Sequence, residues 1–118
     1  MPRTSFHAWL SGGDFEVVLD MLRAWLQTND FKIQDRLAGM EIVHEGDGLY
    51  VFCHEGRPTS DSRPNYLMEG KIDANPEAAA ERLRPLLQLS ESRQVELSLE
   101  YVPIDENGEE IGDEISLR

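Results

Sequence analysis

Strict alternation of apolar and polar residues between Val95 and Tyr101 is the feature that most constrains how this chain folds. A period of two places successive side chains on opposite faces of a β-strand, so one face packs on a core while the other contacts water. The apolar positions are Val95, Leu97, Leu99 and Tyr101, and the polar positions are Glu96, Ser98 and Glu100. The chain is therefore expected to build a sheet that is covered on one face.

Similar patterns predict strands elsewhere in the chain. The segment from Arg3 to Leu10 alternates, with the apolar residues Phe6, Ala8 and Leu10 on one side. Residues 31–55 also have a strand pattern, in which Gly46-Asp47-Gly48 joins segments 40–45 and 49–54 as a hairpin, because glycine permits a positive φ. A further strand is expected over residues 66–73, after a polar loop of residues 56–65.

A second hairpin is predicted at Asn107-Gly108, a pair that favours tight β-turns. A two-residue turn there would place Tyr101 opposite a glutamate, whereas a shift of one residue pairs Tyr101 with the apolar Ile115. We predict the shifted register, with a β-bulge near Pro103 or Gly112 to accommodate it.

Two stretches have the periodicity of amphipathic helices. The first begins after Ser11-Gly12-Gly13-Asp14 and is expected to end near Thr28-Asn29, where asparagine tolerates a left-handed cap. The second begins at Asn75-Pro76-Glu77, which supplies an N-cap, a proline in the first turn and a favourable carboxylate. Pro85 lies inside this second helix and is expected to kink it or to shorten it to about three turns.

These elements predict one α+β domain over residues 1–118, in the order β-α-β-β-β-α-β-β. The expected architecture is a two-layer sandwich, with two helices packed on one face of a mostly antiparallel five- to six-stranded sheet.

The charge balance excludes several classes of partner. The chain carries 11 basic and 23 acidic residues, for a net charge of −12. We therefore expect no binding to nucleic acid and none to anionic membrane surfaces, since both depend on lysine and arginine. A single cysteine, the lack of a signal-peptide pattern and the lack of a long apolar run predict a cytoplasmic protein.

The residues around the central hairpin do not predict a metal site, a cofactor or a catalytic set. His44 and His54 flank the turn with Cys53 nearby, a composition that could ligate zinc. The strand periodicity places His44 and His54 on opposite faces of the sheet, however, so they cannot share one ion. Cys53 lies among apolar neighbours and is expected to be a core residue.

The leading hypothesis is a non-enzymatic interaction module that associates through the outer sheet face or a sheet edge, most simply as a homodimer. If the helices cover the other face, an uncovered apolar group results, and exposed groups of this kind mark interfaces. Its members are Val43, Tyr50, Phe52 and Trp9. Alternatively, the sheet curls and partly buries this face within one chain.

Two other functions stay open. Arg57 or Arg63 could recognise an anionic small molecule in a cleft between sheet and helices, with His44 or His54 as the acid–base group of an enzyme. The acidic chain could also be a decoy for a basic protein partner. Residues 95–118 carry eight acidic residues and one arginine, which weakens this last reading, because such charge also protects a sheet edge from unwanted pairing.

Overall fold

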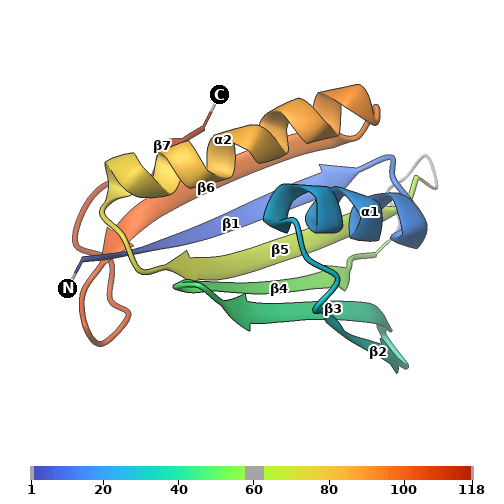
Figure 1. The fold of residues 1–118 in the computed structure, drawn as a ribbon, viewed down its shortest axis with the longest axis horizontal. Coiled ribbons are helices and arrows are strands. Elements are labelled where there is room, and N and C mark those ends of the chain that lie inside the picture. The colour runs from blue at the N-terminus through green and yellow to red at the C-terminus, as the bar shows by residue number, and fades with distance from the viewer. Residues whose placement is uncertain (1, 58–62, 118) are drawn as a thin grey trace.

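The computed structural model describes residues 2–57 and 63–117. In this part of the chain, two helices pack on one face of a seven-stranded antiparallel sheet (Figure 1). The strands are β1 (Arg3–Ser11), β2 (Lys32–Arg36), β3 (Gly39–Gly46), β4 (Leu49–Glu55), β5 (Asn65–Ile72), β6 (Glu96–Ile104) and β7 (Ile115–Ser116), and the helices are α1 (Phe15–Leu26) and α2 (Pro76–Ser92). The predicted α+β sandwich is confirmed, with more strands than the five or six expected.

The strands lie in the order β2-β3-β4-β5-β1-β6-β7. β2 was missed as a separate strand, so four strands rather than three lie between the helices. Its residues are mostly exposed, and it pairs only with β3 in the part of the chain that the structure describes. An edge strand held by backbone hydrogen bonds needs no alternating apolar pattern, which explains why no pattern marks β2 in the sequence.

The crossover through α2 places β1 inside the sheet. β5 and β6 both pair antiparallel with β1, so they run parallel to each other, and α2 connects them. The inward side chains of β1 pack under the helices. Phe6 is 2% exposed and contacts Trp25 of α1 edge-to-face, with ring centroids 6.4 Å apart.

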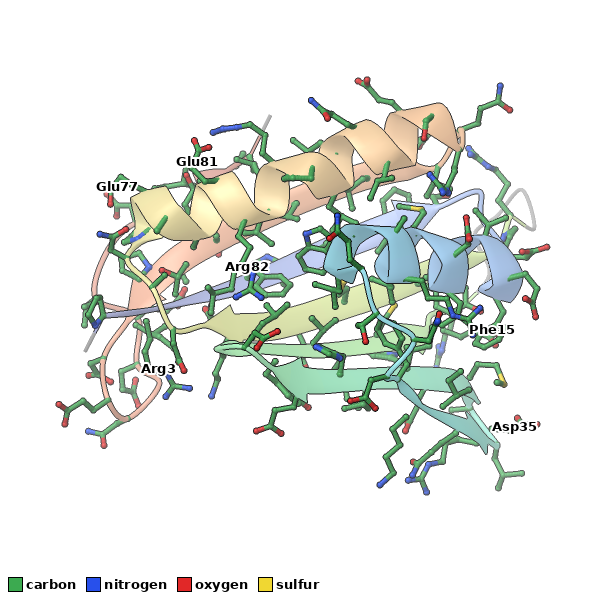
Figure 2. The ribbon with its side chains drawn as sticks, in the orientation of Figure 1. Arg3, Phe15, Asp35, Glu77, Glu81 and Arg82 are labelled. Carbon is green, nitrogen blue, oxygen red and sulfur yellow. The ribbon has the colours of Figure 1, made fainter. Side chains whose placement is uncertain are left out.

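The two helices are tied to each other and to the sheet by polar contacts as well as by the core. Trp25 Nε1 donates a hydrogen bond of 2.8 Å to the carbonyl oxygen of Arg82 on α2. The Arg82 side chain, labelled in Figure 2, in turn donates to the carbonyl oxygen of Asp47 in the β3–β4 turn at 2.7 Å. α2 therefore contacts both α1 and the central hairpin.

The helix boundaries agree only partly with the sequence predictions. Asp14 is the N-cap of α1 and accepts a hydrogen bond from the backbone N–H of Val17 at 3.0 Å. The left-handed cap at the other end is Gln27, with φ 53°, and not Asn29. The predicted shortening of α2 at Pro85 is wrong, because α2 continues for 17 residues. Pro85 lacks the N–H that would donate to the carbonyl oxygen of Glu81, and both residues are exposed.

Both predicted hairpins are present. Asp47 and Gly48 form a two-residue turn with positive φ at both positions, as expected for Gly46-Asp47-Gly48. In the C-terminal hairpin Tyr101 pairs with Ile115, which confirms the shifted register. The register changes near Gly112. Glu110 pairs with Ile104, residues 111–114 lie outside any strand, and strand pairing resumes at β7.

Candidate functional site

The sheet face opposite the helices is the first candidate site. Phe6, Ala8 and Leu10 of β1 point to the helices and are buried, so the alternate residue Trp9 points the other way. Figure 1 shows both helices on the same side of the sheet, and no described helix or strand covers the opposite side. Trp9 is 36% exposed and Leu67, its partner on β5, is 42% exposed.

Cross-strand pairing gathers apolar and aromatic side chains on this outer face. Trp9 pairs with Leu67, which pairs with His54, and these three residues form one row across β1, β5 and β4. Phe52 and Val43 pair in the next row, and the Phe52 and His54 rings lie 5.3 Å apart. We call this group the outer-face cluster, and its members are Trp9, Val43, Tyr50, Phe52, His54 and Leu67.

The outer-face cluster brings together all four residues that the sequence suggested for an interface. Trp9 and Leu67 are exposed, and Val43, Tyr50 and Phe52 are half-buried. The half-burial arises from neighbours on the same face, since the described chain adds no second layer there. The sheet thus leaves this face accessible.

Each row of the outer-face cluster also holds a carboxylate. Glu41 pairs with His54, Glu69 pairs with Phe52, and Glu45 pairs with Tyr50. Lys32 and Lys71 lie on the same face, opposite Val43 and Tyr50 respectively. Apolar side chains are therefore interleaved with charges of both signs, and Glu41 is already ion-paired with Arg36 at 3.3 Å.

A cavity of about 790 Å³ at the end of β4 and β5 is the second candidate site. The N-terminus of α1 forms one side of it, through Asp14 and Phe15. Its other lining residues are Ala38, His54, Glu55, Gly56, Arg57, Pro64, Asn65, Tyr66 and Leu67. Since His54 and Leu67 belong to the outer-face cluster, the cavity opens beside that cluster.

The cavity does not collect the four ligand-binding residues suggested by the sequence. His54 and Arg57 line it. Arg63 forms an ion pair with Glu96 at 3.4 Å, and His44 lies on the helix face of the sheet, where Nδ1 is 2.9 Å from the carbonyl oxygen of Asp30. Of the suggested arginines and histidines, Arg57 and His54 therefore line one cavity, and Arg63 and His44 are not among its lining residues. The part of the polar loop at residues 58–62 lies outside the described residues.

The ionisable groups in the cavity are suited to structural roles. Tyr66 is 2% exposed, and burial, followed by the neighbouring Glu55 carboxylate, raises the pKa of its phenol. Glu55 itself accepts a hydrogen bond from the backbone N–H of Met40 at 3.0 Å. A phenol that stays protonated and a carboxylate that is already engaged anchor β3 to β4 and β5; they do not form an acid–base pair poised near neutral pH.

Cys53 is not a nucleophile. Its side chain is fully buried among core residues, and this burial raises the pKa of the thiol to about 12. The thiolate is the reactive form of cysteine, so this residue is inert at neutral pH. The expectation that Cys53 is a core residue is confirmed.

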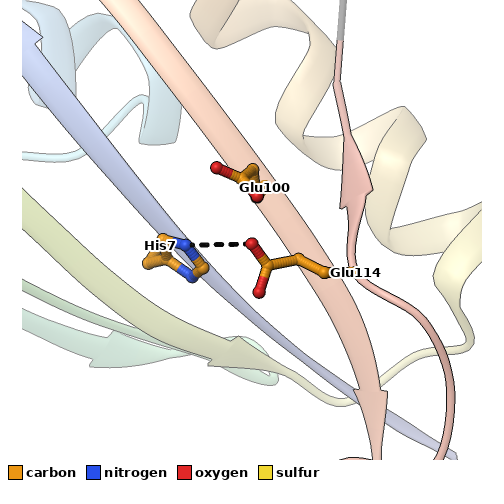
Figure 3. A group of neighbouring side chains, drawn as sticks. All are labelled: His7, Glu100 and Glu114. Carbon is orange, nitrogen blue, oxygen red and sulfur yellow. Dashed lines mark ion pairs between the residues drawn. The ribbon is translucent and has the colours of Figure 1, made fainter.

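A third group of side chains was missed by the sequence analysis. His7, Glu100 and Glu114 meet on the outer face at β1, β6 and the segment before β7 (Figure 3). The alternation of β1 places His7 on the side away from Phe6 and Ala8, but its carboxylate neighbours depend on the strand order, which places β6 beside β1. Outward alternation of β1 and β6 was the only sequence signal available.

Compared with known protein families and with curated proteins, the sequence shows no match to either. Among the described residues, no helix is both long and apolar enough to cross a membrane.

Proposed function

We propose that this chain is a non-enzymatic interaction module, and that the outer-face cluster docks a protein partner with an apolar centre and a basic rim. The observation that carries the proposal is the exposed row of Trp9 and Leu67 beside the half-buried Phe52. Aromatic side chains supply a large apolar contact area and are enriched at protein interfaces. An uncovered sheet face with several of them favours association over an isolated chain.

The net charge of the chain favours a different protein over a second copy. The outer face itself holds charges of both signs, but each copy would bring a net charge of −12 to the contact. Like charges across an interface oppose association, whereas a basic rim on the partner is attracted to them. This reasoning combines the interaction-module hypothesis with the part of the decoy hypothesis that concerned basic partners.

The test compares two substitutions that add the same charge at different places. Phe52→Glu puts a carboxylate in the centre of the outer-face cluster, and Leu37→Glu puts one at a fully exposed position in the β2–β3 turn. Tagged wild-type, Phe52→Glu and Leu37→Glu chains are used to capture proteins from the native host. Each captured protein is then purified and its affinity for the three chains measured by calorimetry at two salt concentrations.

We expect a basic protein that binds the wild-type and Leu37→Glu chains with a 1:1 stoichiometry. Its affinity should fall at least tenfold with Phe52→Glu, because burying an unpaired charge at the centre of an interface is costly. A higher salt concentration should lower the affinity of the partner further. A partner that is indifferent to Phe52→Glu would contradict the proposal and would point to the exposed β2 edge. If light scattering shows that the wild-type chain is a dimer and that Phe52→Glu breaks it, the partner is a second copy of the chain and not the proposed protein.

The cavity beside the outer-face cluster supports one other function, binding of a small anionic molecule. Its volume of about 790 Å³ lies within the range of ligand sites, and Arg57 supplies a cation at its wall. A thermal-shift screen with small carboxylates and phosphates tests this function. A stabilising compound whose effect disappears in Arg57→Ala would support it, and no response across the screen would count against it.

A further inference from the structure

His7, Glu100 and Glu114 are brought together by three neighbouring backbone segments. His7 on β1 pairs directly with Glu100 on β6. Glu100 also pairs with Ser116 on β7, and Glu114 lies two residues before Ser116. Because two of the three residues occupy paired positions in the sheet, their spacing is fixed by the ladder and not by chance contact of flexible loops.

The distances within this cluster suit a small divalent cation. His7 Nε2 lies 3.5 Å from Glu114 Oε1 (Figure 3). Two ligands of a tetrahedral zinc ion with bonds of about 2.1 Å are separated by about 3.4 Å. One donor atom from each of the three residues lies within 4.8 Å of the others. The three residues can therefore each supply one donor atom to a common ion.

The charges around His7, Glu100 and Glu114 favour the binding of a cation. In the described part of the chain, the other carboxylates in ion pairs face arginine: Asp73, Glu41, Glu96, Glu81 and Asp20. Glu100 and Glu114 instead face each other, with carboxylate oxygens within 4.8 Å. Glu69 also pairs with His7 on its other side, which adds negative charge to the surroundings. The only ion-pair partner of this carboxylate pair among the described residues is His7.

We propose that His7, Glu100 and Glu114 bind one divalent transition-metal ion, with Zn²⁺ as the representative ion. One imidazole nitrogen and two carboxylate oxygens form a mixed donor set that suits Zn²⁺ and its neighbours in the first transition row. Mg²⁺ and Ca²⁺ prefer all-oxygen sites with six or more ligands, so they fit this set poorly. Three protein ligands leave the fourth zinc position open to water or to a group from another molecule.

The proposal is tested with ZnCl₂ and MgCl₂ by titration calorimetry on the untagged full chain. We expect one Zn²⁺ per chain and at least tenfold weaker binding of Mg²⁺. Loss of an outer-shell partner alone lowers metal affinity roughly 10- to 100-fold, so His7→Gln and Glu114→Gln should each weaken Zn²⁺ binding at least tenfold. All three cluster residues are at least partly exposed, and circular dichroism checks that the variants fold.

Two matched controls separate this site from general attraction to an acidic chain. Glu106→Gln removes one charge from the tip of the same hairpin, and His54→Gln removes another accessible imidazole from the same face. Both controls should bind Zn²⁺ as the wild-type chain does, and Glu100→Gln should repeat the loss seen with Glu114→Gln. The proposal is overturned if Zn²⁺ does not bind, if His7→Gln binds it normally, if the controls lose as much affinity as the cluster variants, or if Mg²⁺ binds equally well.

Discussion

Gly70 offers a direct test of how the centre of the sheet is packed. This residue of β5 lies between Val51 of β4 and Phe6 of β1. A Cβ atom at Gly70 would overlap the backbone carbonyl oxygen of Tyr50 and would lie 2.5 Å from Cζ of Phe6. Phe6 in turn packs against Trp25, so it has little freedom to move aside.

The expected cost of Gly70→Ala follows from these contacts. Carbon atoms in contact prefer a separation of about 3.5–4.0 Å, so the Phe6 ring must retreat by about 1 Å and the β4 backbone must shift as well. Overpacking of this kind typically costs about 1–3 kcal/mol, and the immobile carbonyl oxygen places Gly70→Ala near 3 kcal/mol. Replacing glycine recovers about 0.7 kcal/mol from the unfolded state, which leaves a net loss of about 2 kcal/mol. For a chain of 118 residues this loss corresponds to a Tm lower by about 8 °C.

Urea denaturation followed by tryptophan fluorescence measures this difference, and Gly46→Ala is the matched control. The nearest atom to a Cβ at Gly46 is Nε2 of His44, at an ordinary 3.6 Å, so this variant should keep its stability to within about 0.5 kcal/mol. Phe6→Leu should lower the free energy of unfolding less in the Gly70→Ala chain than in the wild-type chain, because the smaller side chain relieves part of the overlap. A Gly70→Ala variant as stable as Gly46→Ala would refute the packing described for the sheet centre.

Three further outcomes follow from the structure. Iodoacetamide should modify Cys53 slowly in the native chain and rapidly in urea, because burial raises the pKa of its thiol to about 12; equal rates measured by mass spectrometry would contradict this burial. Asp14→Ala removes the N-cap of α1 and should lower the free energy of unfolding by about 1 kcal/mol in urea denaturation. The raised pKa of Glu114 beside Glu100 means that the folded chain holds this proton more tightly than the unfolded chain, so the pair destabilises the fold as pH rises above about 4.5. In metal-free buffer, Glu114→Gln should therefore melt at a higher temperature than the wild-type chain at pH 7, and the difference should disappear at pH 3.

Local patterns in the sequence predicted the elements whose side chains meet the core. The alternation of Phe6, Ala8 and Leu10 identified β1, and the positive φ required at Asp47-Gly48 identified the central hairpin. The pairing of Tyr101 with Ile115 could be predicted because a one-residue slip would have buried charge. These predictions succeeded because each depends on neighbours in sequence or on one buried face.

Features that depend on backbone pairing or solvent access were harder to predict. β2 is held at the sheet edge by β3 and has largely exposed side chains, so burial left no pattern in its sequence. Pro85 did not shorten α2, and both Pro85 and Glu81, whose carbonyl group it leaves without a donor, are exposed residues. His54 and Arg57 line one cavity, whereas His44 lies on the helix face of the sheet, so only part of the suggested ligand set comes together.

The position of β1 decides what the outer face can bind, and no local pattern encodes that position. Because α2 carries the chain across β1, this strand lies between β5 and β6. Trp9 therefore joins Leu67 in the outer-face cluster, while His7, two residues earlier, joins Glu100. If another strand separated β1 from β6, the apolar row would remain and the histidine would have no second carboxylate beside it. Trp9 and His7 lie two residues apart on β1, so a single strand contributes to both proposed sites. Variants of Trp9 and of His7 can therefore separate partner binding from cation binding on one face.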